Sequence, residues 1–146
     1  MWFYWAVFTV LLLVTSLSVQ YKNDSTALSD QADLDSLSRN MLVYRSAAAE
    51  YAKNNPGYSG VPQDGVLNLP SWFVKLSGVS AYLAMGQSYT FIAVSAPVGL
   101  PAALFERTQS TAVGVNRAGL LISPSSGQTS ITIPSAVPEG AVVAVN

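Results

Sequence analysis

The chain has 146 residues with 7 basic and 8 acidic side chains, no cysteine and no histidine, and it is 10% charged and 50% hydrophobic. The missing residue types exclude disulfides, thiolate or imidazole metal sites, and catalysis by a Ser-His-Asp triad. The net charge of −1 gives no electrostatic reason to bind nucleic acid. A soluble domain is usually about 25% charged, so this chain is expected to bury surface against lipid or protein partners.

The N-terminal 21 residues contain no charged side chain, and Lys22 is the first. As a helix, residues 2–21 would be about 30 Å long, which matches the apolar core of a bilayer. We therefore expect a transmembrane anchor at residues 1–21, with aromatic ends and a leucine-rich centre, marked by Trp2, Trp5, Leu11, Leu12, Leu13 and Tyr21. The alternative is a cleaved signal peptide, although a basic n-region and a good cleavage site are missing. A single flanking lysine leaves both orientations open.

Residues 22–55 have the pattern of one long amphipathic helix. Residues 23–25 can cap its start, and Pro56 with Gly57 ends it. Asp35 and Arg39 are four residues apart and predict a salt bridge. Apolar residues recur at spacings of three and four, at Leu34, Leu37, Met41, Tyr44, Ala48 and Tyr51. We expect this stripe to pack on the chain's own sheet, and the alternative is a coiled coil with a partner.

Residues 56–146 hold all the glycines and prolines and alternate strand-like runs with turns. We expect a hairpin over 78–94, a short helix over 100–110, a second hairpin of 111–115 with 119–123, and short strands at 130–133 and 141–145. Pro134 and Pro138 place the last two strands at sheet edges or in a loose pair.

The predicted fold class is therefore α+β. It combines an N-terminal transmembrane helix, a long amphipathic helix packed on an antiparallel sheet of about four to six strands, and one short helix. The corresponding segments are 1–21, 22–55 and 56–146.

No catalytic motif is present. The glycine pairs 60/65 and 114/119 have the spacing of a phosphate-binding loop, but the lysine and hydroxyl residue that must follow are absent, so both are expected in turns. Ser71 and Lys75 are one residue too far apart for an S-x-x-K dyad. Asp30, Asp33 and Asp35 lack the glycine of a calcium loop. We expect no enzyme activity, cofactor, metal, nucleic acid or small-molecule substrate.

The aromatic residues and the scarcity of charge after Lys53 suggest a different role. The last 93 residues carry only six charges. Most aromatic side chains are expected in the core, including Trp72 and Phe73, which follow a turn at Leu69-Pro70. Aromatic side chains that stay exposed would serve as anchors in a protein–protein contact. The β-rich domain is therefore predicted to work against other proteins.

Four segments carry a family resemblance: MWFYWAVFTVLLL, YRSAAAEYAKNNPGYSGVPQDGVLNLPSWF, VGVNRAGLLISP and ITIPSAVPEGAVVAVN. In these the chain resembles the short PilM proteins of the type IVb thin pili of conjugative plasmids, which are unrelated to the larger actin-like protein of that name. The resemblance implies a single-pass inner-membrane protein of pilus biogenesis, with its C-terminal domain in the periplasm and other pilus-assembly or basal-body proteins as partners. Self-association fits the same interpretation. The alternative is a pilin-like minor subunit of the pilus.

Overall fold

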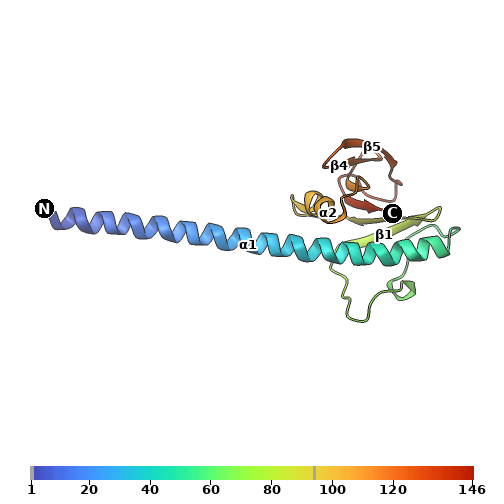
Figure 1. Cartoon of the computed structure of the whole chain (residues 1–146), viewed down its shortest axis with the longest axis horizontal. Coiled ribbons are helices and arrows are strands. Elements are labelled where there is room, and N and C mark those ends of the chain that lie inside the picture. The colour runs from blue at the N-terminus through green and yellow to red at the C-terminus, as the bar shows by residue number, and fades with distance from the viewer. Residues whose placement is uncertain (1, 94) are drawn as a thin grey trace. The chain divides into compact units, whose positions relative to one another are not determined.

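A computed structural model describes residues 2–93 and 95–146, and within helix α1 it describes the side chains of residues 4–10 and 26–54 (Figure 1). Two compact units are present, Met1–Asp33 and Leu34–Asn146. The elements in chain order are α1 (Trp2–Asn54), the 3-10 helix η1 (Asp64–Val66), β1 (Val79–Ala84), β2 (Gln87–Ile92), α2 (Leu100–Thr108), β3 (Val113–Arg117), β4 (Leu120–Ser123), β5 (Gly127–Thr132) and β6 (Val142–Val145).

Helix α1 runs for 53 residues without interruption. No glycine or proline occurs before Pro56, so no residue breaks the helix at the boundary predicted after residue 21. The Asn55 N–H donates to the Tyr51 carbonyl at 2.9 Å and closes the last turn, after which Pro56 cannot continue the helical hydrogen bonds. The sequence predicted one helix over residues 1–21 and another over 22–55, whereas the structure has the single helix α1 in this stretch.

The predicted N-terminal transmembrane helix is wrong. In the part of the chain that the structure describes, no helix is both long and apolar enough to cross a membrane. The apolar run forms the first part of α1, and this helix continues into charged residues from Lys22 onward. The run therefore does not begin and end as a separate helix. Of the predicted anchor residues, Trp5 has an exposed side chain. The side chains of the others lie outside those described, namely Trp2, Leu11, Leu12, Leu13 and Tyr21.

Six antiparallel strands form one sheet in the order β1-β2-β6-β3-β4-β5. The hairpin β1–β2 turns at Met85 and Gly86, and the hairpin β3–β4 turns at Ala118 and Gly119. All four turn residues have positive φ, as two-residue hairpin turns of type I′ require. Both predicted hairpins are therefore present.

Strand β6 is central, between β2 and β3, and all four of its residues are buried. The prediction of an edge strand or loose pair at 141–145 is wrong, because Pro138 precedes the strand and leaves every N–H of Val142–Val145 free to join the ladders. The preceding strand, β5, does lie at a sheet edge.

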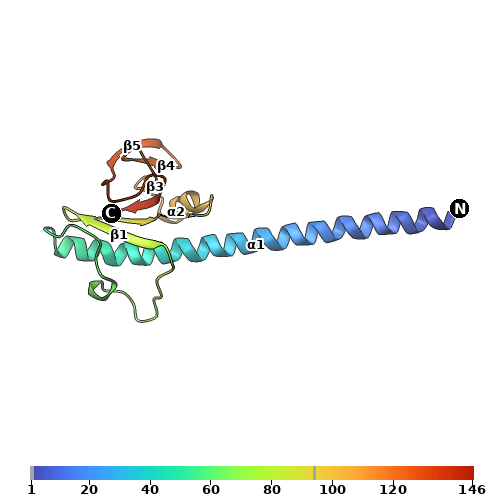
Figure 2. The same cartoon turned by 180° about the vertical axis from the view of Figure 1, so that it is seen from behind.

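Each face of the sheet has its own apolar core. One face packs against α1 and α2 (Figures 1 and 2), in a cluster that includes Met41, Tyr44 and Leu104. The other face packs against the segment that follows β5, and Phe91 and Val137 belong to that cluster. The first core fixes the position of residues 34–54 of α1 against the sheet.

Candidate functional site

The loop of residues 57–78 is fastened to α1 by side-chain hydrogen bonds. The Asn40 Nδ2 donates to the Val74 carbonyl at 2.7 Å, and the Asn40 Oδ1 accepts from the Leu76 N–H at 3.1 Å. Further along the helix, the Asn68 Nδ2 lies 3.4 Å from both carboxylate oxygens of Glu50. Figures 1 and 2 both show the loop on the side of α1 opposite α2 and β4. The loop is thus held against the helix face that the sheet leaves free.

Tyr44 joins this loop to the core. Its side chain is 1% exposed, and its hydroxyl donates to the Asp64 Oδ1 at 2.7 Å. The Lys75 Nζ lies 2.7 Å from the Asp64 Oδ2 and 5.3 Å from the centre of the Tyr44 ring. Burial, and then the hydrogen bond to Asp64, raise the pKa of Tyr44. The hydrogen bond from Lys75 lowers the pKa of Asp64. The three groups form a neutral phenol beside an ion pair, which is a structural anchor.

This ion pair also gives Lys75 a structural role. In the sequence, Lys75 lies four residues after Ser71. Because both carboxylate oxygens of Asp64 bind the ammonium group, at 2.7 and 2.9 Å, Lys75 is committed to the loop. A lysine that acts as a general base must instead be neutral and close to a nucleophile.

Trp72 is 71% exposed, so its predicted burial is wrong. The Phe73 N–H donates to the Pro70 carbonyl at 2.9 Å, and this turn directs Phe73 inward, where it stacks on Tyr44 with ring centres 6.4 Å apart. Trp72 meets the Phe73 ring edge-on, with the same centre separation and an interplanar angle of 69°. The turn of residues 70–73 therefore places Phe73 against the helix and leaves Trp72 on the outside.

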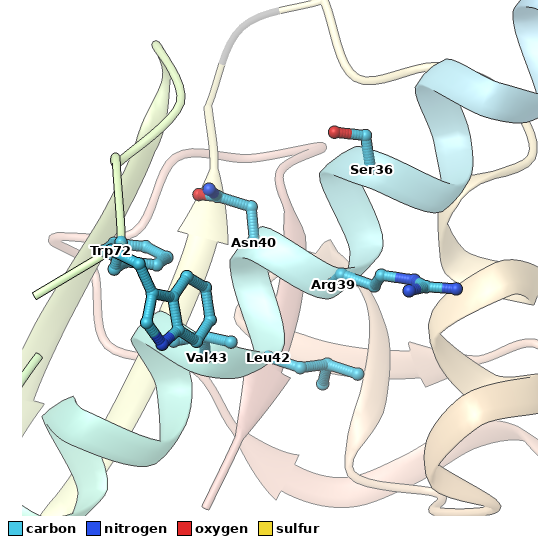
Figure 3. Close-up of a pocket in the computed structure, with 7 residues that line it drawn as sticks. Ser36, Arg39, Asn40, Leu42, Val43 and Trp72 are labelled. Atoms are coloured by element: carbon cyan, nitrogen blue, oxygen red, sulfur yellow. The ribbon is translucent and has the colours of Figure 1, made fainter. Parts of the chain in front are cut away.

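The exposed Trp72 borders an open groove of about 510 Å³ on α1 (Figure 3). Its apolar lining comes from the helix and the loop, and polar side chains lie around it; the residues are Ser36, Arg39, Asn40, Leu42, Val43, Trp72 and Phe73. The Arg39 Nε is 3.0 Å from the Asp35 Oδ2, as the four-residue spacing predicted. Asp35 also pairs with Arg107 of α2. An apolar groove with an exposed tryptophan at its edge suits a segment of another protein.

The stripe predicted as a packing or interface face lies elsewhere on the helix. Its members Met41, Tyr44 and Ala48 are buried in the core between helix and sheet. The remaining members are partly buried and pack against the same core: Leu34, Leu37 and Tyr51. The stripe therefore faces the chain's own sheet, and the groove uses another face of α1.

Sequence reasoning missed the groove, although one signal was available. Leu42 and Val43 are apolar residues outside the heptad stripe, and they follow the Met41 position directly. Leu42 packs partly against the core cluster, so Val43 is the member of this pair that lies off the core face, and an apolar residue in that position indicates a second contact. The 57–78 loop covers part of that surface, and the groove is the part that it leaves open.

Comparison with known proteins gives a consistent family. The model of the PilM family matches residues 8–145. A crystal structure described as a pilM protein of Pseudomonas aeruginosa 2192 is 49% identical, with a TM-score of 0.51, and the match covers 75% of this chain and 91% of that one. A second, described as PilM of Escherichia coli B7A, is 21% identical with a TM-score of 0.59, covers 80% and 93%, and shows the fold alone. No curated protein matches the chain.

Proposed function

The chain belongs to the PilM family and has a role in pilus biogenesis, and we propose that it fills this role as a non-enzymatic, inner-membrane component of the pilus-assembly apparatus or basal body. Its partners are other pilus-assembly proteins, and the pilus is the thin, type IV pilus of conjugation. The observation that carries the proposal is the exposed Trp72 beside an apolar groove, on a loop that Asn40 and Tyr44 hold in place.

The chemistry of the groove supports binding over catalysis. Its polar side chains are those of Ser36, Arg39 and Asn40, and the last two are already engaged in contacts with Asp35 and with the loop backbone. Tryptophan and arginine are the residue types most enriched where protein contacts carry their binding energy. A partner segment with an apolar side chain for the groove would match this lining.

The location that we propose is the inner membrane, with the unit Leu34–Asn146 in the periplasm. Exposed aromatic and apolar side chains in the N-terminal unit support a membrane location, because water solvates them poorly; they are Tyr4, Trp5, Val7, Phe8 and Val10. The family resemblance supports the periplasmic side.

An alkaline phosphatase fusion to Asn146 tests this location. We expect the fusion to be active, because the phosphatase folds only in the oxidising periplasm. We also expect it to sediment with the membrane fraction, because the proposed location is the inner membrane. A matched fusion to a cytoplasmic fluorescent reporter is expected to accumulate without fluorescence. An inactive phosphatase fusion that accumulates at full length would contradict the periplasmic placement.

Replacing Trp72 by alanine tests the groove. We expect partner binding to weaken by about 2 kcal/mol, roughly 30-fold, with a corresponding loss of pilus assembly, because an exposed anchor is removed. The free energy of unfolding should change by less than about 1 kcal/mol, since the side chain is mostly in solvent. The measurements are photo-crosslinking from position 43 in the groove, pilus yield and urea denaturation.

The matched control is Val98→Ala, which truncates a fully exposed apolar side chain (100%) outside the groove. This variant should assemble pili at the normal level. If Trp72→Ala and Val98→Ala give the same pilus yield, the groove is not the binding site. Recovery of the chain in sheared pili would instead favour the pilin-like subunit.

A further inference from the structure

The 57–78 loop contains a chemically reactive pair of residues, Asp64 followed by Gly65. The carboxyl carbon of an aspartate side chain can be attacked by the backbone nitrogen of the next residue. Glycine hinders this attack least, because it has no Cβ. No other aspartate of the chain is followed by glycine. The sequence therefore marks Asp64 as the aspartate at which this reaction is least hindered.

The surroundings of Gly65 leave the attacking nitrogen free. Among the residues that the structure describes, no group accepts a hydrogen bond from the Gly65 N–H. A Cβ built at Gly65 would meet no atom within 4 Å, so the space beside this residue is open. Asp64 and Gly65 are both exposed. Water can therefore reach the peptide that joins them.

The backbone around the pair is held by a single short turn, the 3-10 helix η1. The Val66 N–H donates to the Gln63 carbonyl at 3.1 Å, and the Leu67 N–H donates to the Asp64 carbonyl at 3.3 Å, which is long for such a bond. A 3-10 turn also has poorer hydrogen-bond geometry than an α-helix. The backbone of Asp64 can therefore open locally, without disturbing α1 or the sheet.

The carboxylate of Asp64, in contrast, is protected. Its Oδ1 accepts from the Tyr44 hydroxyl at 2.7 Å, and its Oδ2 lies 2.7 Å from the Lys75 Nζ. The hydrogen bond from Lys75 lowers the pKa of Asp64, so the carboxyl group is held in its ionised form. An ionised carboxylate resists attack, because the departing oxygen must leave as water and the uncharged acid is the form that releases it.

We propose that Asp64 is a site of isoaspartate formation and that its contacts with Tyr44 and Lys75 hold the reaction back. The Gly65 nitrogen forms a bond to the side-chain carboxyl carbon of Asp64. The carboxyl hydroxyl leaves with the amide proton as one water molecule, and a cyclic imide results. Another water molecule then breaks the bond between the Gly65 nitrogen and the main-chain carbonyl carbon of Asp64. The chain now runs through the former side chain, and no oxidant or cofactor takes part.

Isoaspartate at position 64 would release the loop from its anchor. The main chain gains one carbon atom there, and the remaining carboxylate is attached directly to the Cα. This shorter carboxylate no longer matches the positions of the Tyr44 hydroxyl and the Lys75 ammonium group, which bind Asp64 in the structure. Hydrogen exchange in residues 57–78 should become faster. The further expectation, a weaker groove beside Trp72, rests on the proposed function.

Ageing of the purified full chain in neutral buffer tests the proposal, with isoaspartate located by electron-transfer fragmentation of its peptides. We expect Lys75→Ala to form isoaspartate at position 64 about tenfold faster than the natural chain, because loss of a neighbouring cation raises a carboxyl pKa by about one unit or more. Lys75→Arg keeps a cation beside Asp64 and should react at the natural rate. Asp35, which precedes a serine within α1, is the internal control and should stay unmodified.

Gly65→Ala separates the chemistry from a general loosening of the loop. It adds a methyl group where the structure has open space, so the fold is retained while the attacking nitrogen is hindered. Combined with Lys75→Ala, it should return the rate toward that of the natural chain.

Three results would overturn the proposal: equal rates in Lys75→Ala and the natural chain, a double variant as fast as Lys75→Ala alone, or modification of Asp35 as fast as that of Asp64. No partner takes part in these measurements, so their outcome is independent of Trp72→Ala.

Discussion

Replacing Gly114 by alanine is expected to lower the free energy of unfolding by about 3 kcal/mol, near the upper end for overpacking a buried site. A Cβ at this position would lie 2.0 Å from the carbonyl oxygen and 2.6 Å from the carbonyl carbon of Ile122. Both atoms belong to the backbone of β4, so they cannot rotate away as a flexible side chain would. The strands β3 and β4 would have to separate, which weakens the ladder that joins β4 and β5 to the rest of the sheet.

Urea denaturation followed by circular dichroism measures this change. Gly57→Ala is the matched control, because no atom lies within 4 Å of a Cβ at this position and the φ of Gly57 is outside the left-handed region. The control should stay within about 0.5 kcal/mol of the natural chain. Equal unfolding midpoints for the two variants would show that β3 and β4 separate at little cost.

The same geometry explains the glycine pair that resembles a phosphate-binding loop in the sequence. Gly114 is required by the close approach of β4, and Gly119 by its positive φ of 76° in the β3–β4 turn. The two glycines meet two unrelated requirements of the backbone, and their five-residue spacing is a coincidence. Glycine spacing alone therefore carries little functional information when the residues that contact phosphate are absent.

Local sequence patterns predicted the helix ends and hairpins that nearby residues determine. The end of α1 follows from Pro56, and each hairpin turns at a glycine, Gly86 or Gly119, which accepts positive φ without strain. The central position of β6 depends instead on pairing with β2 and β3, which lie far away in the sequence. No turn signal or periodicity in Val142–Val145 encodes those partners, and the nearby prolines pointed to an edge.

The groove was hidden for a similar reason. Whether Trp72 or Phe73 turns inward is decided by Pro70 within the loop and by Asn40 and Tyr44 on α1. The composition, with its few charges, predicts that some aromatic side chains stay exposed to solvent. It does not show which of them do. The heptad stripe gave the core face of α1, and Val43, outside that stripe, lines the groove.

Tyr44→Ala is expected to cost about 4 kcal/mol of folding free energy, because a buried aromatic side chain is lost and a cavity remains between α1, the loop and the sheet. Tyr44→Phe keeps the ring and its stack with Phe73, and removes only the hydroxyl that donates to Asp64. Its cost should be about 1 kcal/mol, since Asp64 stays paired with Lys75 and is reached by water. Tyr4→Ala is the control, because that side chain is 82% exposed, and it should change stability by less than about 0.5 kcal/mol.

The two Tyr44 variants also separate the folding of the core from the order of the groove. Hydrogen exchange followed by mass spectrometry should show faster exchange in residues 57–78 of Tyr44→Ala, because Phe73 loses the ring on which it stacks. In Tyr44→Phe the exchange should remain close to that of the natural chain, since Asn40 and the Asp64–Lys75 pair still hold the loop. If Tyr44→Phe loosened the loop as much as Tyr44→Ala, the hydroxyl bond to Asp64, and not the aromatic stack, would be what positions Trp72.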